Sequence, residues 1–75
     1  MDILRVAGGN IRKLREASGL SQQELAERSG LKRSYMGYIE RGEKDVTLTT
    51  LRRIAIALHV HPSVLLIEYA AFWNG

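Results

Sequence analysis

Four consecutive residues near the middle of the 75-residue chain carry groups that can bind an anion or recognise a hydrogen-bonding pattern. They supply two cations and two hydroxyl groups: Lys32, Arg33, Ser34 and Tyr35. A guanidinium group can pair with O6 and N7 of a guanine, an ammonium group can contact a phosphate, and hydroxyl groups can bond to either. This run is therefore suited to nucleic-acid recognition, provided that a rigid element presents it.

The residues around this run predict two short helices joined by a tight turn. Ser21 can cap the first helix, and Glu24 stands three residues later, where a capping box places an acid. Gly30 suits a turn with a left-handed backbone. The second helix then begins with the cations and hydroxyls and turns its apolar residues to the other side. Such a pair, spanning about 21–40, is the helix-turn-helix arrangement.

Three further helices complete the expected all-α architecture. The spacing of apolar residues predicts helices at about 3–18, 21–28, 32–40, 48–59 and 62–72. Gly8 and Gly9 interrupt the first pattern at about 1 kcal/mol each relative to alanine, but we expect a continuous helix there. Thr47 can cap the fourth helix, and Pro62 suits the first position of the fifth.

The last predicted helix is apolar on nearly all sides, since Glu68 is its only charged residue. A helix of this kind lies in the middle of a core or against another chain. The core of a domain this small is already occupied by the other helices, so we expect a homodimer interface at about 62–73. The contact residues expected there are Val64, Leu65, Ile67, Glu68, Tyr69, Phe72 and Trp73.

The composition predicts one folded domain over residues 1–75. The net charge of +3 and the isoelectric point of about 9.7 fit a polyanionic partner, but they fit a mildly basic protein without one equally well. The chain has no cysteine, which excludes a disulfide framework and a thiolate zinc site. No signal peptide or membrane span is visible, and we expect a cytoplasmic location.

Catalytic and metal-binding arrangements are not visible in the sequence. His59 and His61 lie two residues apart with no nearby acid, which favours a loop or helix-cap role over a metal site. Serine, histidine and aspartate all occur, but nothing fixes them together as a nucleophile with its base. We therefore expect that the protein is not an enzyme and that it binds no cofactor and no small-molecule ligand.

The stretch from Asn10 to Leu66 resembles the lambda-repressor/Cro-like (XRE) helix-turn-helix family, in one register over about three-quarters of the chain. The resemblance is carried by Ile11-Arg12-Lys13-Leu14-Arg15, Gly19-Leu20-Ser21-Gln22-Gln23-Glu24-Leu25-Ala26, Ser29-Gly30-Leu31, Ser34-Tyr35, Ile39-Glu40-Arg41-Gly42, Thr47-Leu48 and Leu51-Arg52-Arg53-Ile54-Ala55. Within the family, the short length, the Arg33-Ser34-Tyr35 triplet and Lys44 are similar to restriction-modification controller proteins. A small phage-type repressor would look much the same.

The resemblance implies a five-helix lambda-repressor-like DNA-binding domain that forms a symmetric dimer through its last helix. Two recognition helices would then enter successive major grooves of double-stranded DNA at an inverted-repeat operator. The resemblance also implies that Glu40 pairs with Arg15. That ion pair would hold the recognition helix in place and would not touch DNA.

Eight residues are expected at the DNA, and several have a second interpretation. They are Gln22, Lys32, Arg33, Ser34, Tyr35, Tyr38, Arg41 and Lys44. Arg33 is the candidate for base readout, and the alternatives are a phosphate clamp or a solvated arginine. Gln22 is the candidate for a phosphate contact at the start of a helix, and the alternative is a side chain that only faces solvent. Tyr35 offers a hydroxyl to a phosphate or a ring to a thymine methyl, but it can also be a packing residue.

Acidic residues nearly balance the cations in this stretch, with four acids and five cations between residues 22 and 44. A surface that binds DNA must keep its acids away from the phosphates. We therefore expect Glu24, Glu27, Glu40 and Glu43 to point elsewhere or to pair inside the protein.

The expected function is that of a sequence-specific DNA-binding transcriptional regulator, acting as a homodimer and regulating its own promoter as a controller protein. The alternative is a protein-interaction module of the same fold, such as an antitoxin. In that case the apolar last helix would cover a different protein instead of a second copy of the chain.

Overall fold

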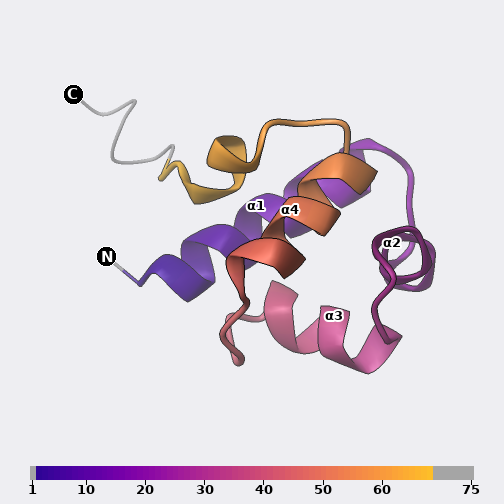
Figure 1. Ribbon diagram of the computed structural model, residues 1–75, viewed down its shortest axis with the longest axis horizontal. Helices are drawn as coiled ribbons and strands as arrows, with labels where there is room; N and C mark the ends of the chain where they lie inside the picture. Colours follow the sequence, from indigo (N-terminus) through magenta and orange to yellow (C-terminus); the bar gives the residue numbers. More distant parts are fainter. Residues whose placement is uncertain (1, 69–75) are drawn as a thin grey trace.

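The computed structural model describes residues 2–68, which form an all-helical fold with no strand in that range (Figure 1). The elements in chain order are α1 (Ile3–Ala17), α2 (Gln22–Ser29), α3 (Arg33–Glu40), α4 (Leu48–Ala57) and the short 3-10 helix η1 (Pro62–Leu66). The all-α class is confirmed. The expectation of five α-helices is wrong, because within residues 2–68 the fifth element is a single short 3-10 helix.

The helix-turn-helix forms because its capping residues act as the sequence predicts. The Ser21 hydroxyl accepts a hydrogen bond from the Glu24 amide at 3.0 Å, and the Glu24 carboxylate accepts one from the Ser21 amide at 3.0 Å. Hydrogen bonding to Ser21, first through its backbone amide, lowers the pKa of the Glu24 carboxyl. Gly30 ends α2 with a φ of 69°, a left-handed conformation that favours glycine. The turn to α3 is therefore tight.

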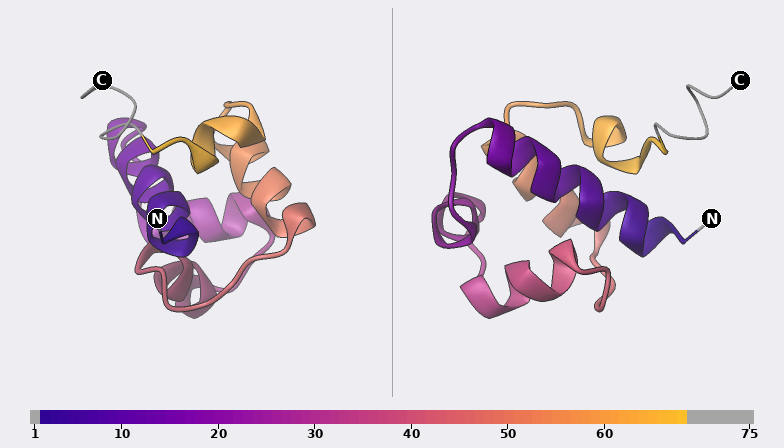
Figure 2. Two further views of the ribbon diagram at one scale, coloured as in Figure 1. Left: turned by 90° about the vertical axis from the view of Figure 1, so that its left-hand side faces the viewer. Right: turned by 180° about the vertical axis from the view of Figure 1, so that it is seen from behind.

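Every element contributes to one core. α1 lies against α3 and η1, α2 lies against α3 and α4, and η1 also contacts α4 (Figure 2). The largest side chains enclosed between these elements are Ile11, Leu25, Met36, Ile39, Ile54 and Leu65. Because α1, α4 and η1 pack around the α2–α3 pair, they hold the helix-turn-helix in one orientation.

α1 runs unbroken through Gly8 and Gly9, as the apolar spacing predicts. A methyl group on Gly8 would lie 2.3 Å from the carbonyl oxygen of Ile39 and 2.7 Å from that of Glu40. A methyl group on Gly9 would meet nothing within 4 Å. Gly8 therefore allows α1 to approach the backbone of α3. The sequence does not distinguish the two glycines, since both lower helix propensity equally.

The chain after α4 differs from the predicted last helix. η1 is short, and Ile67 after it has an extended backbone with a ψ of 124°. The side-chain amide of Asn10 donates to the carbonyl oxygens of Leu65 and Ile67, each at 2.9 Å. The carbonyl oxygen of Val64 lies 3.4 Å from the same amide nitrogen. In a continuing α-helix such carbonyls would accept from the following turn. Contacts with α1 thus replace the next turn of helix.

The residues predicted for a dimer interface do not share one environment. Leu65 is fully buried in the core where η1 meets α1 and α4, so its assignment to the interface is wrong. The half-buried members of the predicted set are Val64, Ile67 and Glu68. The members that lie outside the described residues are Tyr69, Phe72 and Trp73.

We expect Asn10→Leu to lower the free energy of unfolding by about 1–3 kcal/mol, because half-buried carbonyls lose their donor. Urea unfolding followed by circular dichroism measures this change. Gln23→Leu is the matched control, since the Gln23 amide makes an exposed bond of 2.8 Å to Glu27. It should alter stability by less than about 0.5 kcal/mol. Equal losses in the two variants would contradict a specific role for Asn10.

Candidate nucleic-acid interface

The turn between α2 and α3 leaves the start of α3 open to solvent. Lys32, Arg33 and Ser34 are all exposed. Lys32 is the N-cap residue of α3, and its side chain makes no hydrogen bond to the first-turn amides, unlike Ser21 before α2. The positive end of the α3 dipole and two cationic side chains therefore lie together at the surface.

A shallow hollow of about 460 Å³ lies beside this turn. Its lining comes from the turn, from α3 and from the loop after α3: Gly30, Leu31, Lys32, Ser34, Tyr35, Tyr38 and Lys44. The fold thus brings together five of the eight residues predicted for DNA binding, with two ammonium groups and three hydroxyls. The other three, which do not line the hollow, are Gln22, Arg33 and Arg41.

Tyr35 lines the hollow and also packs against the core. The residue is half-buried, and its ring packs against the buried cluster. Its hydroxyl donates to the backbone carbonyl of Asp45 at 3.2 Å. The packing role that the sequence left open for Tyr35 is therefore present, and its hydroxyl holds the loop that follows α3.

Tyr38 lies one turn further along α3 and is 39% exposed. Two cations of the following loop stand over its ring, Arg41 at 5.1 Å and Lys44 at 4.7 Å from the ring centroid. Both distances lie within the range of a cation–π interaction. Arg41 also forms an exposed ion pair with Glu43, with 2.8 Å between Nε and Oε1.

Arg15 of α1 and Glu40 of α3 form the ion pair that the family resemblance implies. Arg15 Nε lies 2.7 Å from Glu40 Oε2, and Arg15 Nη2 lies 3.1 Å from Glu40 Oε1. The two side chains are only 12% and 2% exposed. The hydrogen bond to Glu40 raises the pKa of the Arg15 guanidinium. The pair fastens the candidate recognition helix to α1.

Two further bonds extend this ion pair into a network. Arg15 Nη1 donates to the carbonyl oxygen of Leu20 at 2.8 Å, and Gln22 Nε2 donates to Glu40 Oε1 at 3.1 Å. The Glu40 carboxylate therefore joins α1, α2 and α3. The half-buried Gln22 side chain is engaged in this contact, which the sequence did not reveal because the two residues lie 18 positions apart without a shared pattern.

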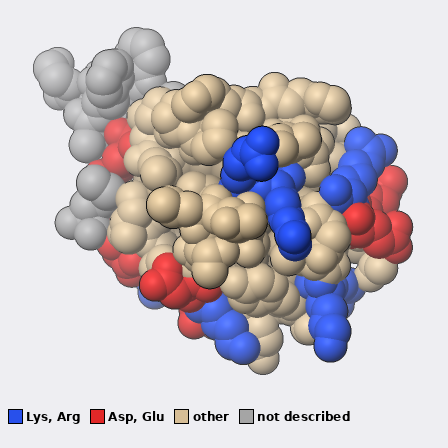
Figure 3. All heavy atoms as spheres, in the orientation of Figure 1, with Lys and Arg blue, Asp and Glu red and all other residues tan. Residues whose placement is uncertain are grey.

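All four acids between residues 22 and 44 accept hydrogen bonds within the protein. Glu24 belongs to the capping box, Glu27 accepts from Gln23, Glu40 accepts from Arg15 and Gln22, and Glu43 accepts from Arg41. Figure 3 shows lysine and arginine side chains at several separate places on the viewed face, with acids beside some of them. On this face the cations therefore form separate groups and not one continuous patch.

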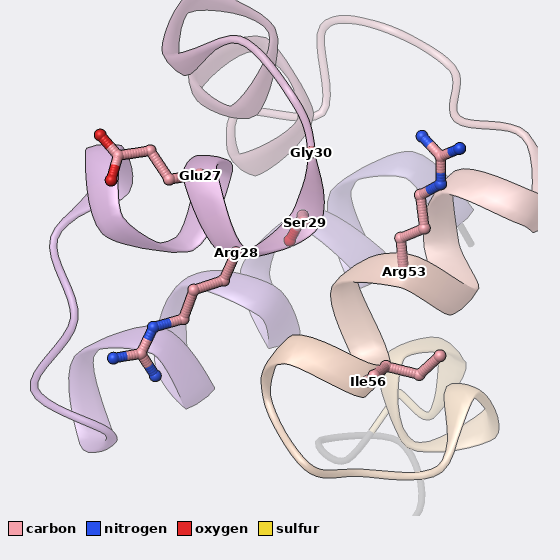
Figure 4. Close-up of a pocket in the computed structure, with 6 residues that line it drawn as sticks. All are labelled: Glu27, Arg28, Ser29, Gly30, Arg53 and Ile56. Atoms are coloured by element: carbon pink, nitrogen blue, oxygen red, sulfur yellow. The ribbon is translucent and has the colours of Figure 1, made fainter.

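A second hollow lies between the end of α2 and α4, and it gathers none of the predicted residues (Figure 4). The side chains of Arg28 and Arg53 point in different directions from its rim. The buried Ser29 hydroxyl beside it has no hydrogen-bond partner in the part of the chain that the structure describes. This hollow has no convergent set of polar groups that would hold a ligand.

Residues 2–68 contain neither a metal-binding cluster nor a helix that could span a membrane. The described histidine, aspartate and glutamate side chains form no group of three that could hold a metal ion. His61 instead caps η1, since its Nδ1 accepts from the Ser63 amide at 3.2 Å. Among the described helices, none has the length and apolar content needed to cross a bilayer.

Two exposed apolar side chains lie at positions that the sequence did not predict as contact residues. Ile56 on α4 is 58% exposed, and Leu66 at the end of η1 is 39% exposed. Ile56 could have been found, because it lies off the buried stripe of its helix, where an amphipathic pattern places polar residues. Leu66 was obscured by the prediction that the surrounding segment is a regular α-helix.

Comparison with known proteins agrees with this geometry. The helix-turn-helix family model matches residues 11–65. Control protein C.SmaI of Serratia marcescens is 47% identical over 66 residues, which cover 88% of this chain and 79% of that protein. The crystal structure of the restriction-modification controller protein C.AhdI from Aeromonas hydrophila is 47% identical, with a TM-score of 0.81, over 83% of this chain and 94% of that one.

A structure solved with DNA is also similar. It is the biofilm regulator SinR in complex with DNA, 32% identical with a TM-score of 0.78, over 81% of this chain and 98% of that one. The family match covers most of the chain, and the relatives are matched over most of their own length. The chain therefore belongs to the XRE-type helix-turn-helix family, and restriction-modification controller proteins are among its close relatives.

Proposed function

We propose that this chain is a sequence-specific DNA-binding transcriptional regulator that acts as a homodimer on an inverted-repeat operator. The observation that carries the proposal is the exposed first turn of α3, where Lys32, Arg33 and Ser34 project from a helix-turn-helix whose α2 is capped at both ends. Relatives named as controller proteins and a regulator solved with DNA support it. We further propose control of a restriction-modification system, with its own promoter as the target.

The roles of the side chains follow from their positions. The first turn of α3 enters the major groove, where Arg33 pairs with a guanine and Ser34 bonds to a base or a phosphate. Lys32, Arg41 and Lys44 contact phosphates on either side. Phosphate contacts release counterions and supply most of the affinity without reading sequence, so specificity depends on the few residues that reach base edges.

The proposed dimer rests on apolar side chains at the surface of α4 and η1, two elements that contact each other. Ile56 and Leu66 are exposed there. We propose that these side chains belong to one contiguous apolar patch, the kind of surface that is typical of interfaces. The sequence also predicts Tyr69, Phe72 and Trp73 for the interface, and these lie outside the described residues. A two-fold dimer would hold two copies of α3 about 34 Å apart, which is one turn of DNA.

Selection of bound duplexes from a random pool tests binding, symmetry and spacing together. We expect an inverted repeat whose half-sites are one helical turn apart, bound by two copies of the chain in sedimentation experiments. The logarithm of the binding constant should fall with that of the salt concentration by about 0.9 per phosphate contact. Affinity that does not change with salt would contradict the proposal. If the protein selects no duplex and binds another protein instead, the result would favour the alternative function of a protein-interaction module.

We expect Arg33→Ala to weaken binding to the selected operator by about 5- to 150-fold, the range for one lost bidentate base contact. Binding to random DNA should weaken much less, because only one charge is removed. Fluorescence anisotropy with both duplexes measures the two effects. Arg12→Ala is the charge-matched control, since Arg12 is exposed on α1 and pairs with Glu16 at 3.6 Å. Equal weakening on both duplexes would make Arg33 a phosphate contact.

A further inference from the structure

We infer that Tyr38 is a positioning residue of the DNA interface: its ring holds the Lys44 ammonium group at the hollow beside the α3 turn, ready for a backbone phosphate. The inference rests on the proposed DNA-binding function and goes beyond it. It gives Tyr38 a role that is exerted through Lys44, whereas the sequence left a phosphate contact and a packing role open for Tyr38.

The geometry places ring, ammonium group and hollow together. Lys44 Nζ stands 4.7 Å from the centroid of the Tyr38 ring, and both side chains line the hollow that also contains Lys32 and Ser34. The second cation over the ring, Arg41 at 5.1 Å, has a further partner of opposite charge. Arg41 pairs with Glu43 at 2.8 Å, and a methyl group on the neighbouring Gly37 would lie 3.1 Å from its Nη1.

Lys44 differs from Arg41 in its partners. The ion pairs of residues 2–68 do not include Lys44, and the cation–π contact with Tyr38 is its defined interaction there. An ammonium group has three donors, so a contact with the face of a ring leaves donors free for phosphate oxygens. The ring therefore orients the cation without neutralising it.

The backbone on both sides of Lys44 is fastened to α3. The Glu43 amide donates to the carbonyl oxygen of Tyr38 at 2.9 Å, and the Tyr35 hydroxyl donates to the carbonyl oxygen of Asp45 at 3.2 Å. The loop position that carries Lys44 is thus fixed by the helix. A lysine side chain nevertheless has many rotamers, and ordering them costs binding free energy. The Tyr38 ring supplies this order before DNA arrives.

The test compares Tyr38→Leu with Tyr38→Phe on the operator duplex selected by the wild-type protein. Phenylalanine keeps the ring face and loses the hydroxyl, whereas leucine loses the ring. We expect Tyr38→Phe to bind within about 1.5-fold of wild type and Tyr38→Leu to bind about two- to fivefold more weakly, the range for one exposed cation–π contact. Urea unfolding of each variant verifies that it is folded.

Double variants identify the group through which Tyr38 acts. Lys44→Gln should weaken binding and reduce the salt slope by about one phosphate contact. In the Lys44→Gln background, Tyr38→Leu should have no further effect, whereas in the Arg41→Gln background its full effect should remain. A cycle of this kind isolates the coupling between two side chains. A purely structural role for Tyr38 would give the same loss in both backgrounds.

Three results would overturn the inference. Tyr38→Phe as weak as Tyr38→Leu would show that the hydroxyl touches DNA directly. Wild-type affinity of Tyr38→Leu would show that the ring does not order the cation for binding. An undiminished effect of Tyr38→Leu in the Lys44→Gln background would place its role elsewhere. Because all variants are compared on a duplex that wild type binds, failure of the proposed function itself would be seen beforehand as absence of wild-type binding.

Discussion

Glu40→Ala should lower the free energy of unfolding by about 3–5 kcal/mol, because it leaves the Arg15 guanidinium almost buried without its carboxylate partner. A domain of this length has a total stability on the order of 4–11 kcal/mol. The loss therefore removes a large share of it, and Gln22 loses its acceptor as well. The urea midpoint, measured by circular dichroism at neutral pH, reports the change.

Glu43→Ala is the matched control for this experiment. It removes an equal charge from an ion pair of nearly equal length, since the N–O distance is 2.7 Å in Arg15–Glu40 and 2.8 Å in Arg41–Glu43. The Arg41–Glu43 side chains are 54% and 51% exposed, so solvent screens the pair and its loss should cost about 0–1 kcal/mol. A similar urea midpoint for both variants would show that the Glu40 network does not hold α3 in place.

Gly8→Ala should destabilise the protein by about 2 kcal/mol or more. The added methyl group would lie 2.3 Å and 2.7 Å from two backbone carbonyl oxygens of α3, which have no rotamer that could move them aside. Overpacking of this kind costs about 1–3 kcal/mol and occasionally more. The gain in helix propensity, about 1 kcal/mol, is too small to offset a clash between two backbones. Thermal unfolding with fitted enthalpies measures the difference.

Gly9→Ala is the control of opposite sign. It makes the same chemical change one residue later in α1, where the new methyl group meets nothing within 4 Å. Here only the propensity term acts, so the variant should be more stable than wild type by about 0.5–1 kcal/mol. Destabilisation of both variants alike would mean that helix geometry, and not the approach of α1 to α3, explains the effect at Gly8.

Capping and turn residues could be predicted because their partners are close in sequence. Ser21 and Glu24 satisfy each other across three residues, Thr47 caps α4 through the Thr50 amide, and Gly30 has the left-handed φ expected of it. Interactions over one turn depend only on helix geometry, which is the same in every protein. For the same reason the exposed run from Lys32 to Ser34 was placed correctly at the start of α3.

The family resemblance added what local patterns do not carry. The bond between Arg15 and Glu40 joins residues 25 positions apart, and no periodicity links them. The resemblance implied the pair, and the structure shows it with both side chains largely buried. The contact of Gln22 with the same carboxylate lies outside that resemblance, and only the packing of α2 against α3 revealed it.

The sequence by itself determined the all-helical class, the helix-turn-helix with its caps, and the cationic turn that α3 presents. The tertiary structure alone decided that Gly8 is a packing contact and that Leu65 belongs to the core. It also decided that the Asn10 side chain bonds to the carbonyl oxygens at the end of η1, which lie 54 to 57 residues further along the chain. A hydrophobic pattern predicts that a residue is buried, but it does not predict which residues it packs against, because the hydrophobic effect is non-directional. Partners distant in the chain are selected only when the helices pack.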